Sequence, residues 1–532
     1  MRLGIDVGGT NTDAVLLEGK TVLSWAKSPT TADVTDGIIE VIEAVLKNAN
    51  VDRSALECVM IGTTHFTNAL VERRGLLEVG IIRLGSPASE ALPPMSGWPS
   101  DLRTHMGETV FLLPGGYEYD GSELTPFNEE KVRRAVKKIR DAGLRTAAVS
   151  CTFGLINPAM EAKTVAIFKE EAPDIAVTVS ASFGRSGFLE RENATIMNAS
   201  LVDMAGHVIT SFKRALDKLG IVAPFYISQN DGTLISASYA ARYPVLTFGS
   251  GPTNSMRGGA FLTGLKDALV MDIGGTTTDI GALTHGFPRE SSVAVDIGGV
   301  RTNFRMPDIL AIGLGGGTRI HLEPDAYDKD SLAVDSFTVG PDSVGYRLNS
   351  DSYLFGGTVL TASDIAVAGG LASFGDASLL PKMNPVVVKG LLRQFQKMME
   401  DGLDRMKTAQ GKVPVILVGG GSVLVGENLM GASTVIRPEH ASVANAVGAA
   451  IAQVGGEAES IVSYDTVPRE EAMRSLQETA VKKVVHAGAD PKTISIIDVD
   501  EVFLSYMPGN TAQLRVKAVG DLALGKNVGK NA

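Results

Sequence analysis

The sequence contains little cysteine, no excess of basic residues and no long apolar run. Among its 532 residues only Cys58 and Cys151 are cysteines, without paired spacing, which excludes a disulfide framework and a zinc or iron–sulfur site. The formal net charge of −11 argues against nonspecific nucleic-acid binding, which needs a basic face. No apolar run approaches membrane-spanning length, and Met1 leads almost directly into an expected strand without room for a signal peptide, so we expect a cytoplasmic protein without a membrane span.

The length and composition predict several globular units. A chain of this length exceeds one ordinary hydrophobic core, which predicts two large domains and a smaller one. The hydrophobic fraction of 44% and the charged fraction of 20% are typical of a soluble globular protein, and 59 glycines predict many tight turns. We expect an N-terminal lobe over 1–200, an interlobe helix and connecting segment over 201–266, a C-terminal lobe over 267–455, and a small α+β tail over 456–532.

Two nearly identical stretches, Asp6–Asp13 and Asp272–Asp279, stand near the starts of the two predicted lobes. Each lies between short apolar runs, which predicts a β-hairpin whose turn is the Gly-Gly-Thr segment. Paired glycines let backbone N–H groups approach an anion, hydroxyls add donors, and flanking carboxylates can hold a hydrated Mg²⁺. Two facing hairpins can clamp the phosphates of one nucleotide. The residues that we expect to bind it are Gly8, Gly9, Thr10, Asn11, Thr12, Gly274, Gly275, Thr276, Thr277 and Thr278.

A Gly-Gly-Thr segment can also form nothing more than a tight turn. One copy would leave the two interpretations about equal, whereas two copies of Asp-x-Gly-Gly-Thr-x-Thr-Asp far apart in the sequence favour nucleotide binding. A third stretch, Asp296–Asn303, lacks the Thr after the glycines and the closing Asp. We interpret it as a structural turn.

Strands alternate with helices along the rest of the chain, which predicts an α/β fold with a mainly parallel sheet. Ser86–Gly121 is rich in Pro and Gly and is expected to be an elaborated loop or a small insertion. A long helix that ends near Leu219 is a candidate hinge between the lobes. The other expected helices are 33–48, 128–142, 158–171, 385–407, 442–454 and 469–487, and the expected strands include 21–27, 56–61, 146–151, 176–180, 225–229 and 413–418.

Polar side chains crowd the start of a helix that follows one of these strands. Simple helix capping accounts for one threonine there, but not for the other hydroxyls, the imidazole and the amide at the same end. We therefore expect these groups to face a substrate. They are Thr63, Thr64, His65, Thr67 and Asn68.

A glycine run follows the all-apolar strand 413–418. Backbone without side chains can pack flat against a purine and ribose, although a close helix–strand crossing would also require glycine. The residues of this run are Gly419, Gly420, Gly421 and Ser422. A second run, Gly313–Gly317, is weaker evidence and is typical of a crowded turn.

The two hairpin stretches and the run at Gly419 together resemble the two phosphate motifs and the adenosine motif of the actin, hexokinase and heat-shock chaperone superfamily. Within it, the chain is similar to the hydantoinase A and 5-oxoprolinase family over roughly its first 450 residues. The stretches that carry this resemblance are Ile61–Arg73, Phe248–Pro252, Asp308–Gly317 and Val339–Gly345.

The resemblance implies two actin-like (ribonuclease H-like) α/β lobes that close on ATP and Mg²⁺. It also implies ATP-dependent opening of a cyclic amide, such as a hydantoin, 5-oxoproline or another lactam, together with a second hydantoinase-type subunit. We expect Asp6 and Asp279, and after them Asp13 and Asp272, to position the metal and water, with Asp6 and Asp272 as the Mg²⁺ ligands. Ring size, the identity of the partner and homo-oligomer formation stay open.

Two other functions fit the same motifs. A small-molecule kinase of the superfamily would need a carboxylate base near the acceptor hydroxyl, and Glu190 or Glu192 are candidates. A non-enzymatic ATP-driven clamp would need no such base. Substrate-dependent release of ADP separates these possibilities.

Overall fold

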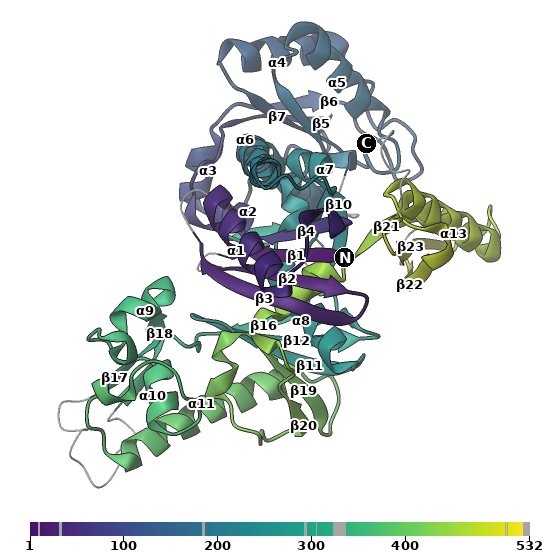
Figure 1. Ribbon diagram of the computed structural model, residues 1–532. Helices are drawn as coiled ribbons and strands as arrows, with labels where there is room; N and C mark the ends of the chain where they lie inside the picture. Colours follow the sequence, from purple (N-terminus) through teal and green to yellow (C-terminus); the bar gives the residue numbers. More distant parts are fainter. Residues whose placement is uncertain are drawn as a thin grey trace.

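The computed structural model describes residues 1–8, 11–30, 34–182, 187–291, 295–304, 306–322, 337–505, 507 and 509–524. It is an α/β protein built on a nine-stranded, a six-stranded and a four-stranded sheet (Figure 1). Its helices are α1 (Val34–Ala49), α2 (His65–Glu72), α3 (Ser100–Met106), α4 (Glu129–Asp141), α5 (Ala159–Glu171), α6 (Phe188–Lys218), α7 (Ala237–Arg242), α8 (Ser250–Thr263), α9 (Leu348–Asp351), α10 (Ala362–Ala368), α11 (Pro385–Met406), α12 (Ala444–Ala450) and α13 (Arg469–His486).

The nine-stranded sheet contains the first hairpin. Its strand order is β22-β23-β21-β10-β9-β4-β1-β2-β3, so strands from the C-terminal tail extend the sheet of the N-terminal lobe. The strands are β1 (Arg2–Val7), β2 (Asn11–Glu18), β3 (Thr21–Pro29), β4 (Cys58–Thr63), β9 (Phe225–Ser228), β10 (Thr233–Ser236), β21 (Gln453–Ser463), β22 (Ser495–Phe503) and β23 (Thr511–Gly520).

The six-stranded sheet contains the second hairpin. Its order is β13-β12-β11-β19-β20, and β16 pairs with β12. The strands are β11 (Ala268–Ile273), β12 (Thr278–Thr284), β13 (Phe287–Pro288), β16 (Ile309–Ile312), β19 (Val413–Val418) and β20 (Ala432–Ile436).

The two larger sheets repeat one arrangement. In each, the hairpin strands are antiparallel, a further antiparallel strand pairs with the second hairpin strand, and the first hairpin strand is flanked by two parallel strands in succession, which are β4 and β9 in one sheet and β19 and β20 in the other. This repetition confirms the predicted α/β fold with two actin-like (ribonuclease H-like) lobes. The division of the chain into four segments stays a prediction.

Helices α8 and α12 lie between the two sheets. On the first sheet, α1 and α6 cover one face, and α12 packs Ala446 and Val447 against Val15 and Leu17 on the other. On the second sheet, α8 covers one face, and α10 and α11 cover the other. The pair α8 and α12 is therefore the contact between the lobes, as Figure 1 shows for α8 below the purple hairpin.

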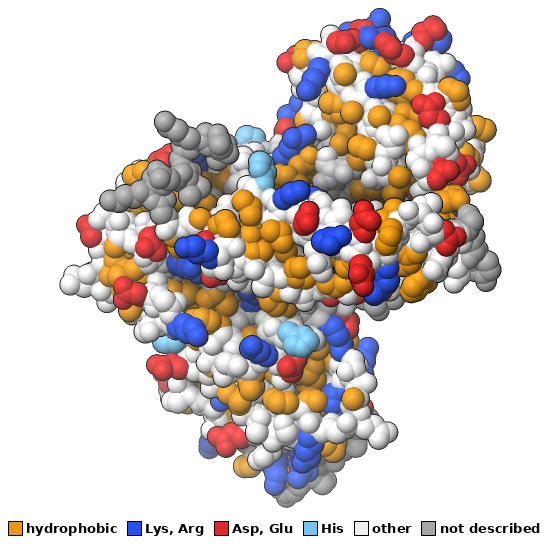
Figure 2. All heavy atoms as spheres, turned by 90° about the vertical axis from the view of Figure 1, so that its right-hand side faces the viewer, with side chains coloured by type: hydrophobic (Ala, Val, Ile, Leu, Met, Phe, Trp, Pro, Cys, Tyr) orange, Lys and Arg blue, Asp and Glu red, His pale blue; other side chains and the backbone are white. Residues whose placement is uncertain are grey.

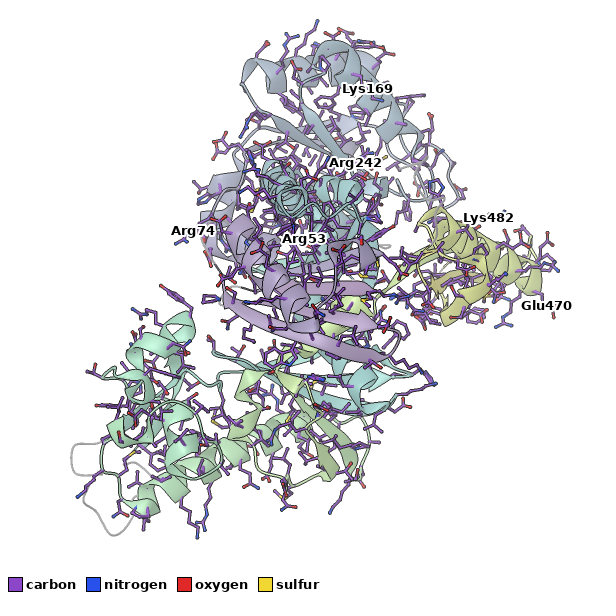
Figure 3. The ribbon with its side chains drawn as sticks, viewed as in Figure 1. Arg53, Arg74, Lys169, Arg242, Glu470 and Lys482 are labelled. Carbon is purple, nitrogen blue, oxygen red and sulfur yellow. The ribbon has the colours of Figure 1, made fainter. Side chains whose placement is uncertain are left out.

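Smaller units surround this centre. The four-stranded sheet, with α4 and α5, forms the top of Figure 1, and α13 packs on the tail strands at its right. Figure 3 shows α13 standing out from the body, with Glu470 and Lys482 at its surface. The remaining strands are β5 (Val79–Ser86), β6 (Val110–Pro114), β7 (Thr146–Cys151), β8 (Ala176–Val179), β14 (Val295–Ile297), β15 (Val300–Thr302), β17 (Thr318–Leu322) and β18 (Phe337–Ser343).

One expectation about local structure was wrong. The helix predicted over 442–454 ends at Ala450, and β21 runs through Gly455 and Gly456, because a glycine there lets α13 lie close: a Cβ on Gly456 would be 2.8 Å from Ala480 O. Ser86–Gly121 contains α3 and β6, so the small insertion describes it better than the elaborated loop. The candidate hinge helix, α6, packs against α1, α7 and β7 and also against β15 from the second half of the chain, and its role as a hinge stays a prediction.

The surface agrees with the composition. On the face shown in Figure 2, Lys and Arg side chains are interspersed with Asp and Glu, and no extended basic patch is visible there. Within the part of the chain that the structure describes, no helix is long and apolar enough to cross a membrane.

Candidate functional site

The two hairpins have the same register and the same turn. Asp6 lies opposite Asp13 on the paired strands, and Asp272 lies opposite Asp279. Gly8 N donates to Asn11 O at 3.0 Å, and the corresponding bond from Gly274 N to Thr277 O is 2.9 Å. Both predicted hairpins are confirmed. Gly9 and Thr10 lie outside the described residues.

The four carboxylates stand on the paired strands and not in the Gly-Gly-Thr turns. Asp6 is 5% exposed and Asp13 is 3% exposed, because α12 covers this face of β1 and β2. Asp272 and Asp279 are half-buried. Substitutions at the first pair therefore act on buried groups, and their effects on stability have to be measured alongside activity.

Two residues that carry no sequence motif hold the first hairpin's carboxylates. Asn445, on α12, donates from Nδ2 to Asp6 Oδ2 at 2.8 Å and to Asp13 Oδ2 at 3.1 Å. Lys27 Nζ lies 3.0 Å from Asp13 Oδ1. Sequence analysis missed both, since a lone lysine on a strand and an asparagine in a small-residue helix give no recognisable signal.

The four carboxylates influence one another across the lobes. Burial, with the nearby charges of Asp13 and Asp272, raises the pKa of Asp6 to about 7. Burial and the charge of Asp272 raise the pKa of Asp279 to about 7. Burial also raises the pKa of Asp272, which the Ser255 hydrogen bond opposes. Since Asp6 and Asp272 come from different lobes, the two hairpins present their carboxylates to one shared space.

The predicted adenosine run lies beside the second hairpin. Gly419 has φ +83°, and a Cβ there would be 2.5 Å from Asp272 Oδ1. A Cβ on Gly421 would be 2.8 Å from Gly274 O. Gly420 is exposed, whereas Ser422 is buried and its backbone oxygen accepts from Arg437 at 2.8 Å. Glycine is required for this close approach of backbone to backbone.

Some threonines in and beside the two turns are exposed, and others form hydrogen bonds within the protein. Thr276 and Thr277 are exposed, as is Gly275. The Thr278 hydroxyl donates to Leu314 O at 2.5 Å, and the Thr12 hydroxyl contacts the Thr30 hydroxyl at 3.2 Å. These engaged groups stabilise the turns.

The glycine run that follows β16 packs directly on the second turn. Gly316 N donates to Gly274 O at 3.0 Å, and Gly317 N donates to Gly275 O at 2.6 Å. The run is therefore a crowded turn, as expected.

The polar start of α2 adjoins the end of β1. Thr64 N donates to Val7 O at 3.3 Å, and the buried Thr63 hydroxyl lies 2.7 Å from His65 Nδ1. Burial lowers the pKa of His65, which favours the neutral imidazole. Asn68 Nδ2 donates to Thr64 Oγ1 at 3.4 Å, and Thr67 is half-buried.

This arrangement brings the predicted substrate-side residues together near the first hairpin. Beyond the opposite end of α2, Arg74 lies at the outer edge of the molecule (Figure 3).

The donor set fits Mg²⁺ bound through a nucleotide. Among the described residues, no three His, Cys, Asp or Glu side chains form a cage for a metal ion. Mg²⁺ keeps several waters and takes one or two carboxylates plus phosphate oxygens. Asp6 Oδ1 is buried without a hydrogen-bond partner within the described ranges, so Asp6 and Asp272 are suitable ligands.

Family models identify the chain's relatives. The model of the hydantoinase/oxoprolinase N-terminal region matches residues 2–172, and the hydantoinase/oxoprolinase model matches residues 191–373. The protein belongs to the hydantoinase/oxoprolinase family. The predicted resemblance is thus confirmed.

Two curated relatives and one solved structure are similar to the chain. The caprolactamase subunit alpha of Pseudomonas jessenii is 27% identical over 405 residues, 71% of this chain and 55% of that protein. The acetophenone carboxylase gamma subunit of Aromatoleum aromaticum is 26% identical over 399 residues, 69% of this chain and 53% of that protein. The chain thus spans about half the length of these relatives.

The crystal structure of the ATP-dependent caprolactamase from Pseudomonas jessenii superposes with a TM-score of 0.78 at 20% identity, covering 99% of this chain and 88% of that chain. At this identity the similarity shows the shared fold.

Proposed function

We propose that this protein uses ATP to activate a carbonyl oxygen, and that its substrate is a cyclic amide such as a hydantoin, 5-oxoproline or another lactam. The observation that carries the proposal is the cluster of Asp6, Asp272 and Asp279, contributed by two equivalent hairpins. Membership of the hydantoinase/oxoprolinase family and the caprolactamase relative support the substrate class.

The chemistry explains why ATP is needed. A ring amide is a poor electrophile because its nitrogen donates electron density into the carbonyl. Transfer of the γ-phosphoryl group to the carbonyl oxygen releases ADP and gives an imidate-like phosphate ester. Water then adds to the ring carbon, the carbon–nitrogen bond breaks, and phosphate and the ring-opened amino acid leave.

The chain's own residues would orient the reactants and accept a proton. Backbone N–H groups of the second turn would donate to the phosphates, and Asp6 and Asp272 would hold Mg²⁺, which would supply charge neutralisation during phosphoryl transfer. Asp279 has no ion pair or hydrogen bond among the described residues, and its raised pKa suits a proton acceptor near neutral pH. The groups at the start of α2, His65 among them, would contact the ring.

The kinase alternative has less support. Glu192 is 1% exposed, and it accepts hydrogen bonds from Arg83 Nε at 2.8 Å and from the Ser150 hydroxyl at 2.6 Å. Glu190 pairs with Arg301 at 3.1 Å. Both proposed bases are therefore occupied by other side chains.

The acetophenone carboxylase relative favours a second candidate, in which the activated carbonyl belongs to a ketone. Release of ADP by the purified chain with Mg-ATP should be measured alone, with a panel of hydantoins and lactams of different ring size, and with ketones plus bicarbonate. We expect the lactam panel to stimulate ADP release at least several-fold. Stimulation by ketones alone would support the second candidate, and no stimulation by any compound would support a non-enzymatic clamp.

We also propose that a second subunit completes the reaction. A phosphorylated amide in an open cleft reverts or hydrolyses unproductively, so a partner that excludes bulk water is physically expected. The matched relatives are named as subunits, which supports this view. The isolated chain should show weak ATPase activity and little ring opening, measured as ADP and amino-acid product per turnover. Stoichiometric ring opening by the chain alone would contradict the proposal, and His65 would then be tested first as the residue that activates water.

A further inference from the structure

Two consecutive residues of α8 lie beside the carboxylates of opposite hairpins. The Ser255 side chain hydrogen-bonds Asp272 of the second hairpin. Asn254 lies beside Asp6 of the first, because a Cβ built on Gly62 would be 2.7 Å from Asn254 Nδ2 and 2.6 Å from Asp6 Oδ1. The two atoms flank one point. A single turn of the interlobe helix therefore reaches both halves of the candidate site.

The position of Asn254 is fixed by backbone contact between α8 and α12. A Cβ on Gly448 would be 1.8 Å from Asn254 O, and a Cβ on Gly258 would be 1.8 Å from Ala444 O. The helices can approach this closely only because both positions are glycine. This close backbone contact restrains α8 against α12, and in this arrangement the Asn254 amide lies beside Asp6 of the first hairpin.

Asn254 is a buried amide whose hydrogen-bonding capacity is unused. It is 0% exposed, and within the described ranges neither Nδ2 nor Oδ1 has a partner. Asp6 Oδ1, which lies near the same Cβ position of Gly62, is also buried without a partner within the described ranges. A buried polar group without a partner is destabilising, so a donor and an acceptor left unpaired near each other indicate a bound group that contacts both.

Asn445 hydrogen-bonds the other carboxylate oxygen of Asp6, Oδ2. It donates to Asp6 Oδ2 at 2.8 Å and stays satisfied through Asp13 as well. One asparagine from each interlobe helix thus lies at each oxygen of Asp6, but only the Oδ2 side is closed. The Oδ1 side presents an unpaired acceptor and the unpaired Asn254 amide, which a single water can join by hydrogen bonds.

We propose that Asn254 is a positioning residue for Asp6: its side-chain N–H donates, through one shared water, to Asp6 Oδ1 and holds this carboxylate in the orientation that binds the metal–nucleotide complex. This inference rests on the proposed nucleotide site. It assigns a role in metal–nucleotide binding to a residue outside every glycine and aspartate motif of the sequence.

The test is a double-mutant cycle on binding, which needs no ring-opening activity. Mn²⁺ is used as the probe in the presence of ADP, and free Mn²⁺ is measured by electron paramagnetic resonance. We expect Asn254→Ala to weaken Mn²⁺–ADP binding roughly tenfold, the effect of one lost hydrogen bond to a charged group. In an Asp6→Asn background the same change should have less than about a twofold effect, because the two groups act together.

Asn198 provides the matched control. It is also 0% exposed, but its Nδ2 donates to Thr178 Oγ1 at 3.1 Å and to Arg242 O at 2.9 Å, far from the hairpins. Asn198→Ala should lower Tm and leave Mn²⁺–ADP affinity unchanged. Asn254→Ala should leave Tm unchanged or raised, since it removes an unsatisfied amide, and Asn254→Ser replaces it if the alanine variant does not fold.

Unchanged Mn²⁺–ADP affinity in Asn254→Ala or Asn254→Ser, or effects that add independently of Asp6→Asn, would overturn the inference. Failure of the proposed function is distinguishable from this outcome. If wild-type protein binds no Mn²⁺–ADP at all, the nucleotide site itself is wrong. If wild type binds and the cycle couples but no lactam is opened, the inference holds and only the substrate proposal fails.

Discussion

The two hairpins share a backbone and differ in what surrounds their carboxylates. In the first, Asp13 pairs with Lys27 at 3.0 Å, and Asn445 bridges Asp13 and Asp6. In the second, Asp279 occupies the place equivalent to Asp13 but has neither a cation nor a hydrogen bond among the described residues. Asp13 and Asp279 therefore occupy equivalent positions, but only Asp13 has a cation beside it.

This difference indicates a division of roles. A carboxylate already paired with an ammonium group is a weak proton acceptor, whereas an unpaired, half-buried one can accept a proton near neutral pH. We expect Asp6 and Asp272 to bind the metal–nucleotide complex and Asp279 to assist the chemical step. The predictions below test this contrast.

The largest effect is expected at Asp279. Asp279→Asn preserves shape but cannot accept a proton, so kcat for ATP turnover should fall about 10²-fold or more. Asp6→Asn should lower turnover at subsaturating ATP, through weakened Mg-ATP binding. Steady-state ADP release over a range of ATP concentrations separates the two, since Asp279→Asn should change kcat and Asp6→Asn should mainly raise KM.

Circular dichroism and Tm measurements accompany these variants, because Asp6 is buried. If both variants are insoluble or unfolded, the two aspartates stabilise the fold of the hairpins and have no role in the reaction. Equal losses in Asp13→Asn and Asp279→Asn would remove the contrast between the hairpins.

Breaking the pair at Lys27 should reduce stability more than catalysis. Lys27→Met leaves the buried Asp13 without its cation, and we expect a loss of about 1 kcal/mol at neutral pH, discounted because the lysine side chain is partly exposed. The loss should shrink as pH falls, because protonation neutralises Asp13 and burial raises the pKa of this carboxyl. Urea unfolding at pH 5 and pH 8 measures it. A larger loss at pH 5 would contradict the pairing.

Stability without nucleotide should fall as pH rises through the site's carboxylates. The pKa values of Asp6 and Asp279 are raised from 3.8 to about 7, so between these values the folded state binds more protons than the unfolded state. The unfolding free energy then decreases with pH across this window. The difference between wild type and Asp279→Asn, measured with EDTA from pH 4 to pH 8, isolates this slope. A flat difference would mean that Asp279 titrates normally.

The sequence predicted the hairpins, but not the residues that complete the site. The two hairpins and β19 could be predicted because short apolar runs adjoin glycines there. Asn445 and Asn254 could not, since each reaches the site through packing of segments far apart in the chain, and Lys27 could not because its contact with Asp13 depends on the pairing of β2 with β3. Asn254 and Asn445 lie on helices whose small residues allow close crossing, and small residues give no chemical signal in a sequence.

Gly455 and Gly456 misled the prediction for a related reason. Glycine after a small-residue helix usually marks the end of that helix, yet here both glycines lie inside β21. Gly456 admits α13 onto the strand and Gly455 leaves room for Thr233 of β10, and both are tertiary requirements.

The smallest effect is expected at Asp296, in the third Gly-Gly stretch. This stretch forms the β14–β15 hairpin, in which the exposed Asp296 accepts through Oδ1 from Gly299 N at 2.8 Å. Asp296→Asn keeps an oxygen acceptor at the same place, so the turn bond survives and the charge lost is solvated. We expect a stability change within about 0.5 kcal/mol and ATP turnover within about twofold of wild type.

Tm and steady-state ADP release check this expectation side by side with Asp279→Asn. The hairpin does touch the candidate site's surroundings, because Arg73, at the end of α2, donates to Gly298 O at 2.9 Å. A strong loss of turnover in Asp296→Asn with unchanged Tm would therefore show that a third hairpin acts on the substrate-side helix. The comparison would then have to include three hairpins instead of two.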